Sequence, residues 1–192
     1  DARPWTLGDQ NTLTDTSVME SGLLPKRMVE LAYVTYLVSD EKGESPKLID
    51  QQSTLVRPDD TFTITNDDIH GIPHAFAAKH GRPLRDVLVD FVSAVERSDV
   101  VVSHNIEFDQ NIVCAEMVRA NMIQTARTFM HETRFVCTMK LAMQTFSLTR
   151  FPTLKHLYEI THPSSPLWTQ AHRAMDDALR AADCYLDLIK RV

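Results

Sequence analysis

The sequence contains few of the residues that mark specialised protein classes. Among 192 residues there are only five glycines and three cysteines, and the longest apolar runs fall well short of the roughly 20 residues that cross a bilayer. Scarce glycine argues against a linker-dominated or low-complexity chain. The cysteines, Cys114, Cys137 and Cys184, are odd in number and form no CxxC pair, which argues against a disulfide framework or a zinc knuckle. We therefore expect an intracellular protein of a reducing compartment, with no membrane partner.

The amino terminus also lacks the common targeting patterns. DARPWTLGDQ has neither the basic-then-apolar form of a secretory signal nor the Arg/Ser-rich form of a transit peptide. Because the first residue is not Met, an upstream segment could precede it in the whole protein. The finer location is left open.

Composition and charge limit the class of protein. Hydrophobic residues make up 43% and charged residues 24%, and the length suits a single domain over residues 1–192. A formal charge of −6 argues against a duplex binder that depends mainly on neutralising phosphates. An acidic site that holds divalent cations would itself contribute negative charge, and phosphates could then be contacted through the metals.

The order of hydrophobic patterns predicts a mixed α/β fold. Two β-rich stretches, 28–38 and 47–57, form a hairpin, and a long irregular stretch follows as far as Pro83. Strands then alternate with helices, which indicates a mixed sheet with helices on its faces. The later elements are a helix at 83–97, a buried strand at 99–105, a helix at 108–121, a short strand and helix within 134–146, a segment at 154–160 capped by Thr153, and a last helix at 173–190.

The first candidate site residue is Asp109, in the segment VVVSHNIEFDQ. It comes just after a buried strand, near the start of a helix, so its carboxylate can point from the end of the sheet into a crevice where open α/β sheets hold ligands. The alternative is that Asp109 is an acid of the first helical turn, favoured there by the helix dipole. This segment alone leaves both interpretations open.

The second candidate segment is AHRAMDDALRAADCYLDL, which contains His172 and, five residues on, Asp177. A carboxylate on a packed helix can hold a metal ion, and a histidine with a pKa near 6.5 can take a proton from water near neutral pH. The alternative is that Asp176 and Asp177 are acids of a helix start and His172 is a surface residue.

Together the two segments resemble a known family. HNIEFD is similar to the second motif, and HRAMDD to the third motif, of the DnaQ-like (DEDDh) 3′–5′ exonucleases, and the order and spacing agree over residues 28–190. HGI at residues 70–72 sits where that family has a loop that contacts the terminal nucleotides. The resemblance implies a ribonuclease H-like mixed five-stranded sheet flanked by helices.

The resemblance also implies a chemistry. In that family four carboxylates bind two divalent ions, Mg²⁺ or Mn²⁺, and a histidine helps to activate water. By position, Asp109 and Asp177 would be metal ligands and His172 the general base, while Phe108 and Val113 would be packing residues. Gly71, Ile72, His104 and Asn105 would contact substrate, although the His104 ring could equally be satisfied by backbone at the end of a strand.

The first motif of the family is irregular in this chain. The family has Asp-x-Glu before Thr/Ser-Gly-Leu, whereas the sequence reads GDQNTLTDTSVMESGLLPKR. Counting back from Ser21 puts Ser17 and Met19 at the ligand positions. Counting from Asp15 keeps the Asp but puts Ser17 where Glu belongs, unless a local insertion lets Glu20 turn inward. We favour this register, with Asp15 and Glu20 as the ligands, and a further register uses Asp9 with Asn11 in place of Glu. The site needs a dense cluster of oxygen ligands, so the loss of two carboxylates should largely abolish two-metal binding.

Two functions are consistent with the sequence. The first is a metal-dependent 3′–5′ exonuclease that acts on single-stranded DNA or RNA ends and releases nucleoside 5′-monophosphates. The second is a catalytically impaired relative that serves as a nucleic-acid-binding or scaffolding subunit of a larger complex. A small-molecule-binding α/β protein is disfavoured, because neither GxGxxG nor GxxxxGK[ST] is present.

Overall fold

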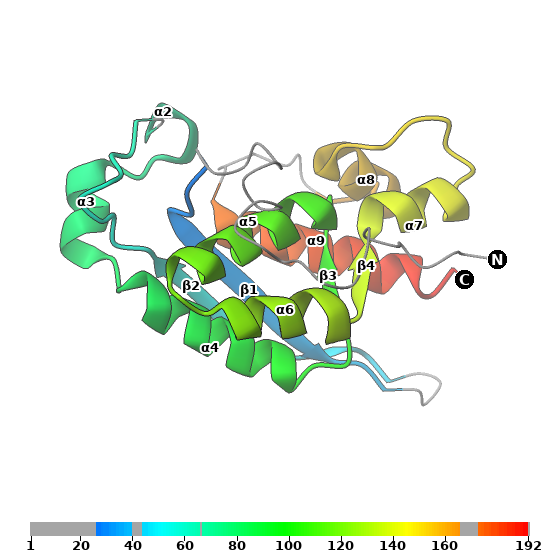
Figure 1. Cartoon of the computed structure of the whole chain (residues 1–192). Coiled ribbons are helices and arrows are strands. Elements are labelled where there is room, and N and C mark those ends of the chain that lie inside the picture. The colour runs from blue at the N-terminus through cyan, green and yellow to red at the C-terminus, as the bar shows by residue number, and fades with distance from the viewer. Residues whose placement is uncertain (1–25, 40–43, 66, 166–172, 192) are drawn as a thin grey trace.

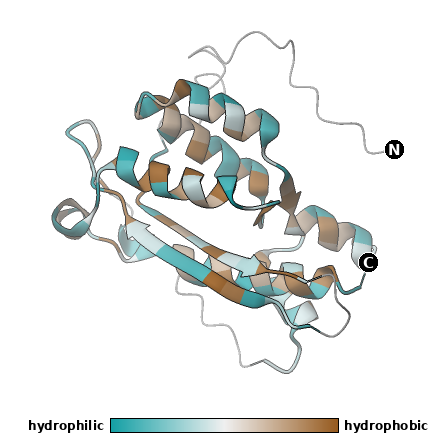
Figure 2. Cartoon of the chain, turned by 90° about the horizontal axis from the view of Figure 1, so that it is seen from below, coloured by the Kyte–Doolittle hydropathy of each residue, from teal (hydrophilic) through white to brown (hydrophobic). Residues whose placement is uncertain are grey.

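The computed structural model describes residues 26–39, 44–65, 67–165 and 173–191. It is a mixed α/β arrangement, as the sequence predicted, with the two longest strands lying between α9 on one side and α4, α5 and α6 on the other (Figure 1). Several helices, among them α4 and α9, are amphipathic, and Figure 2 shows hydrophobic and hydrophilic stretches on the same ribbons. The elements described below are bounded as β1 Glu30–Leu37, β2 Lys47–Leu55, α2 Asp67–His70, α3 His74–His80, α4 Leu84–Glu96, β3 Val101–Ser103, α5 Ile106–Arg119, α6 Ile123–Glu132, β4 Phe135–Cys137, α7 Thr138–Thr145, α8 Leu154–Thr161 and α9 Ala174–Leu188.

The predicted hairpin is confirmed. β1 pairs antiparallel with β2, from Glu30 opposite Leu55 to Leu37 opposite Lys47, with a register shift between Thr35 and Tyr36. β1 is half-buried along most of its length, whereas β2 is largely exposed. β2 is therefore an outer strand, and β1 lies closer to the centre of the fold.

The five-stranded sheet that the resemblance implied is only partly seen. The described residues form four strands in two separate sheets, β1 with β2 and β3 with β4, and the second pair is parallel. Within the described ranges β1 and β3 are therefore not hydrogen-bonded to each other, and residues of both strands line one cleft. α9 packs against both strands and connects the two halves.

Most helix predictions are confirmed to within two residues. α4 begins directly after Pro83, and its buried face includes Val87, Leu88 and Phe91. The Thr153 hydroxyl accepts a hydrogen bond of 3.2 Å from the His156 amide at the start of α8, as predicted for a cap.

Two predictions about loops were wrong or incomplete. The stretch expected to be irregular before Pro83 contains α2 and α3, and the short helix α6 was not predicted. α2 and α3 are four and seven residues long, too short for a clear helical repeat of apolar residues. α6 is recognisable only by its buried Ala126 and Phe129.

The main hydrophobic core lies where α4, α5 and α6 pack on the start of the hairpin. Its buried members include Met28, Leu88, Met117 and Phe129. A second cluster joins α7, α8 and α9 around Leu157 and Leu188. These two cores fix α5 and α9, the helices that contain the candidate site residues.

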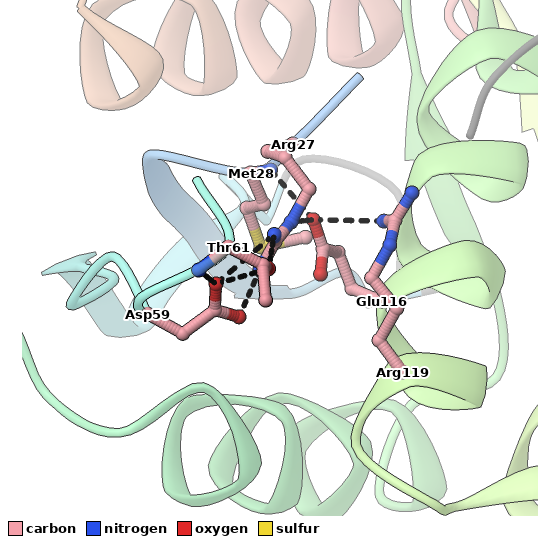
Figure 3. A network of polar contacts seen from close by, with 6 residues as sticks. All are labelled: Arg27, Met28, Asp59, Thr61, Glu116 and Arg119. Carbon is pink, nitrogen blue, oxygen red and sulfur yellow. Dashed lines mark hydrogen bonds and ion pairs between the residues drawn. The ribbon is translucent and has the colours of Figure 1, made fainter. Parts of the chain in front are cut away.

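A buried carboxylate ties α5 to the beginning of β1. The side chain of Glu116 is 1% exposed, and its Oε1 accepts hydrogen bonds from the Met28 amide at 2.8 Å and from Arg27 Nε at 3.2 Å. Arg119 Nη1 lies 3.1 Å from the same oxygen, and Arg27 also pairs with Asp59 at 2.7 Å (Figure 3). This network fixes α5, β1 and the loop at residue 59 relative to one another.

The thiols provide a simple test of the packing. Burial raises the pKa of Cys114 to about 12 and that of Cys184 to about 11. Since the thiolate is the reactive form, we expect both thiols of the native chain to react with DTNB at pH 8 at least about a hundredfold more slowly than those of the urea-unfolded chain. Rapid labelling of Cys114 in the native chain would contradict this packing.

Within the described ranges, the helices are too short or too polar to cross a membrane.

Candidate active site

A large cleft of about 1350 Å³ separates the two sheets. Its walls come from the inner edge of β1, from β3, from the first half of α5 and from α9, and the loop before α3 lies at one end. Both candidate carboxylates, Asp109 and Asp177, line it. The structure thus brings together in one cleft two acids that are 68 positions apart in the sequence.

Asp109 is in the first turn of α5, directly after β3. Its carboxylate Oδ2 accepts a hydrogen bond from the hydroxyl of Ser103, the last residue of β3. The strand end therefore orients the acid. Ser103 was not predicted as a site residue, because a serine at a strand end has no distinctive sequence pattern.

The electrostatics of Asp109 favour a bound cation. The carboxyl is accessible from the cleft, but the surrounding walls displace much of the water around it, and this burial raises its pKa. The hydrogen bond from Ser103 opposes the rise, and the negative charge of Asp177 adds to it. Two carboxylates that repel each other in a partly desolvated cleft would both be stabilised by a divalent cation between them.

Asp177 is half-buried in the first turn of α9. Its backbone amide donates a hydrogen bond of 3.2 Å to the Arg173 carbonyl, which closes that turn. The neighbouring Asp176 is exposed and does not line the cleft. Of the two adjacent acids, Asp177 is thus the one that the fold directs to the site.

The beginning of α9 is held by a glutamate of β1. Glu30 Oε1 accepts a hydrogen bond from Arg173 Nη2 at 2.8 Å, and Oε2 accepts from Arg173 Nε at 3.2 Å and from the Ala174 amide at 3.1 Å. Ser53 donates to Oε1 at 2.8 Å. The Glu30 side chain is 6% exposed. Sequence reasoning missed this contact, because Glu30 and Arg173 are far apart in the chain.

The hydrogen bonds to Glu30 should make the free energy of unfolding depend on pH. Burial alone would raise the pKa of Glu30, but the hydrogen bonds from Arg173, Ser53 and Ala174 outweigh it and lower the pKa. A carboxyl with a lowered folded-state pKa stabilises the fold above its unfolded pKa, and this stabilisation is lost as the pH falls through the folded pKa. We expect urea titrations to show a larger loss of unfolding free energy between about pH 5 and pH 3 in the wild type than in Glu30→Gln. Equal losses would contradict the prediction; Glu96→Gln, at an exposed position, is the control.

His104 lies at the base of the cleft with both ring nitrogens engaged. Nδ1 is 2.8 Å from Thr138 Oγ1, and Nε2 is 3.0 Å from the Pro152 carbonyl. The ring thus joins β3 to the start of α7 and to the loop before α8. The sequence left open that backbone satisfies this ring, and the Pro152 carbonyl does so for one of its two nitrogens. Asn105 adopts a left-handed backbone conformation, with φ of 67°, and is exposed at the start of α5. Substrate contact by either residue stays a prediction.

The HGI loop connects α2 to α3. Gly71 has a φ of +68°, which favours glycine, and the Ile72 amide donates to His70 Nδ1 at 3.2 Å. The Ile72 side chain is 2% exposed and packs with Ile64 and Ala77. The side chain of Ile69, by contrast, is exposed and lines the cleft. Substrate contact by Gly71 and Ile72 stays a prediction, and Ile69 is an additional candidate.

Phe108 differs from its predicted role. It was expected to be a packing residue, yet its side chain is 43% exposed and lines the cleft beside Asp109. The Lys26 ammonium lies 4.7 Å from the centre of its ring. Val113, the other predicted packing residue, is buried as expected.

Several predicted site residues lie outside the described residues. These are the predicted general base His172, the first-motif acids Asp15 and Glu20, and the alternative acid Asp9. Among the residues that the structure describes, no group of three or more His, Cys, Asp or Glu side chains is placed to hold a metal. Asp109 and Asp177 are the two predicted ligands that can be located.

Comparison with known proteins identifies a matching family and a similar fold. The family model RNase_T, described as exonuclease, matches residues 21–185, a range that begins after Asp15 and Glu20 and includes His172. The solved structure "Exonuclease X in complex with 5′ overhanging duplex DNA" aligns with a TM-score of 0.57 at 24% identity, over 84% of this chain and 82% of that one. At this identity the likeness concerns the fold. No match is found among curated proteins.

Proposed function

Since the chain belongs to the exonuclease family, in agreement with its resemblance to the DnaQ-like members of the ribonuclease H-like class, we propose that it is a metal-dependent 3′–5′ exonuclease. Its substrates would be single-stranded ends of DNA or RNA, and its products nucleoside 5′-monophosphates. One observation carries the proposal: Asp109 of α5 and Asp177 of α9 line the same cleft.

The donor atoms of the site fit a hard divalent cation. Asp109 and Asp177 offer carboxylate oxygens, the ligands that Mg²⁺ and Mn²⁺ prefer, and their mutual repulsion is relieved when a cation binds. Bound there, Mg²⁺ or Mn²⁺ would stabilise the charge that develops on the phosphate. The first-motif acids, Asp15 and Glu20, would complete a two-ion site.

The chain's own residues would divide the remaining work. Ser103 holds the Asp109 carboxylate in one orientation through its hydroxyl. His172 would accept the proton of the attacking water, since an imidazole titrates near neutral pH. The loop of Gly71 and Ile72, together with the exposed Ile69 that lines the cleft, would meet the terminal nucleotide.

One observation favours the rival function, a non-catalytic nucleic-acid-binding or scaffolding subunit. The family match begins at residue 21, after the first-motif acids, and within the described residues no third acidic or histidine ligand joins Asp109 and Asp177. A site with two carboxylates could hold an ion weakly and still bind a strand without cleaving it.

Degradation of end-labelled oligonucleotides tests the proposal. Single-stranded RNA and DNA carrying 3′ or 5′ labels are incubated with Mg²⁺, Mn²⁺ or EDTA and the wild-type chain, Asp177→Asn or Asp176→Asn. Asp176 is the matched control, because it is adjacent to Asp177 but exposed outside the cleft. We expect metal-dependent shortening from the 3′ end that is lost in Asp177→Asn and retained in Asp176→Asn.

Two results would reject parts of the proposal. Folded wild-type chain that binds the strand without cleaving it would reject the enzyme and favour the rival. Cleavage that persists in EDTA, or that is as fast in Asp177→Asn as in the wild type, would reject the metal site assigned to Asp109 and Asp177.

A further inference from the structure

The first turn of α9 is capped from outside the helix. The residue before the helix, Arg173, provides no side-chain cap for its amides. The Glu30 carboxylate of β1 accepts the Ala174 amide instead, at 3.1 Å, and holds the Arg173 guanidinium through both of its oxygens. A free helix start leaves several amides without partners, so this carboxylate supplies what the helix's own sequence lacks.

The capped turn is the one that contains a site acid. Asp177 is three residues after Ala174, and its amide is hydrogen-bonded to the Arg173 carbonyl. In the sequence Arg173 follows directly on His172. Any rotation or fraying of this turn would change the position of the Asp177 carboxylate relative to Asp109 on α5.

Packing already attaches the body of α9 without this contact. α9 lies against β1 and β3, and its buried Ala181, Cys184 and Leu188 are further along the helix. The Glu30 contact is at the extreme end of the helix, and it is a bidentate ion pair between the nearly buried Glu30 and the Arg173 side chain, which is 45% exposed. Its geometry is suited to fixing the direction of one helical turn.

We propose that Glu30 is a positioning residue for the hydrolysis: through Arg173 and the Ala174 amide it fixes the first turn of α9 and hence the separation of Asp177 from Asp109. This inference rests on the proposed function. Glu30 lines the cleft, but both of its carboxylate oxygens are engaged by Arg173, Ser53 and the Ala174 amide, so it acts through the start of α9. Its counterpart is Glu116, which binds the Met28 amide and so ties α5 to the same end of β1.

The test compares the wild-type chain with four variants. Glu30→Gln removes the charge that holds Arg173, Arg173→Gln removes the other partner, and the double variant removes both. Ser53→Ala is the matched control, because it deletes a hydrogen bond to Glu30 but leaves the link to α9 intact. For each chain, kcat and KM on a labelled single-stranded oligonucleotide are measured together with hydrogen exchange of the amides at Ala174–Asp177.

We expect kcat to fall about 30- to 100-fold in both single variants, since small misplacements of a reacting group have effects of this size. KM should change by less than about threefold, and the double variant should be no slower than the singles, because both residues act through one contact. Exchange at Ala174–Asp177 should accelerate, while the core of α5 stays protected. Ser53→Ala should remain within about threefold of the wild type in kcat.

Other results overturn the inference. Unchanged exchange in the first turn of α9 would show that Glu30 does not hold it. Faster exchange with unchanged kcat would show that the contact is only structural. A wild-type chain that does not cleave would reject the proposed function, and exchange alone would then decide whether Glu30 fixes the turn.

Discussion

The substitution Asp109→Asn is expected to lower the rate of metal-dependent hydrolysis by roughly a thousandfold, equivalent to about 4 kcal/mol of transition-state stabilisation. An asparagine keeps the size and one carbonyl oxygen but loses the negative charge that binds a hard cation. Initial rates at saturating oligonucleotide and several Mn²⁺ concentrations measure the effect.

The same variant should not be less stable than the wild type. The pKa of Asp109 is raised by burial and by Asp177, so its ionised form is disfavoured in the fold. A neutral amide removes this unfavourable charge and can still accept the hydrogen bond from Ser103. We expect urea unfolding at pH 7 to be unchanged or shifted to higher urea, which separates the catalytic effect from unfolding.

Glu107→Gln provides the matched control for Asp109→Asn. Glu107 is an exposed acid in the same first turn of α5, and it forms an ion pair of 2.6 Å with Lys140. Its loss should change the rate by less than about threefold, because exposed pairs contribute little. If Asp109→Asn keeps more than about a tenth of the wild-type rate while Glu107→Gln is normal, Asp109 is not a ligand of an essential metal.

The second large effect concerns stability. Glu116→Ala is expected to lower the free energy of unfolding by about 3–5 kcal/mol. The substitution leaves Arg27 and Arg119, whose side chains are 12% and 20% exposed, without their shared acceptor. It also leaves the Met28 amide without the carboxylate to which it donates. Urea unfolding followed by circular dichroism measures the change.

Two variants make this result interpretable. Glu116→Gln keeps an acceptor for the Met28 amide and should lose less stability than the alanine variant. Asp90→Ala breaks the exposed Arg82–Asp90 pair and should cost about 0–1 kcal/mol. A loss below about 1 kcal/mol in Glu116→Ala would mean that both arginines reach water and that the network does not hold α5.

The sequence predicted the elements that have strong periodic patterns. α4 and α9 show long apolar faces, and the hairpin is rich in β-branched and aromatic residues, so local preference and burial agree there. α2 and α3 were missed because they are short and are stabilised by non-local contacts. For example, the His74 ring accepts the Ile64 amide at 3.3 Å, a contact that no local pattern encodes.

The candidate site was predictable only in part, for a similar reason. HNIEFD and HRAMDD indicated Asp109 and Asp177 because their positions relative to a strand and a helix are local properties. The hydrogen bond from Ser103 to Asp109 and the contact of Glu30 with the start of α9 became visible only from the structure, because Glu30 and Arg173 are 143 positions apart. The first-motif acids, Asp15 and Glu20, lie outside both the described residues and the family match, and their role stays a prediction.

The separation of the two sheets has a consequence for solubility. The inner edge of β1 forms one wall of the cleft, and its segment from Leu31 to Leu37 contains no charged residue and no proline. A strand edge of this composition is a template to which other extended chains add, and proteins usually protect such edges with charges, bulges or covering segments. β2, the outer strand, has Lys47 and Asp50, whereas β1 has only the register shift between Thr35 and Tyr36. A segment that covered this edge would therefore also lower the tendency of the chain to aggregate.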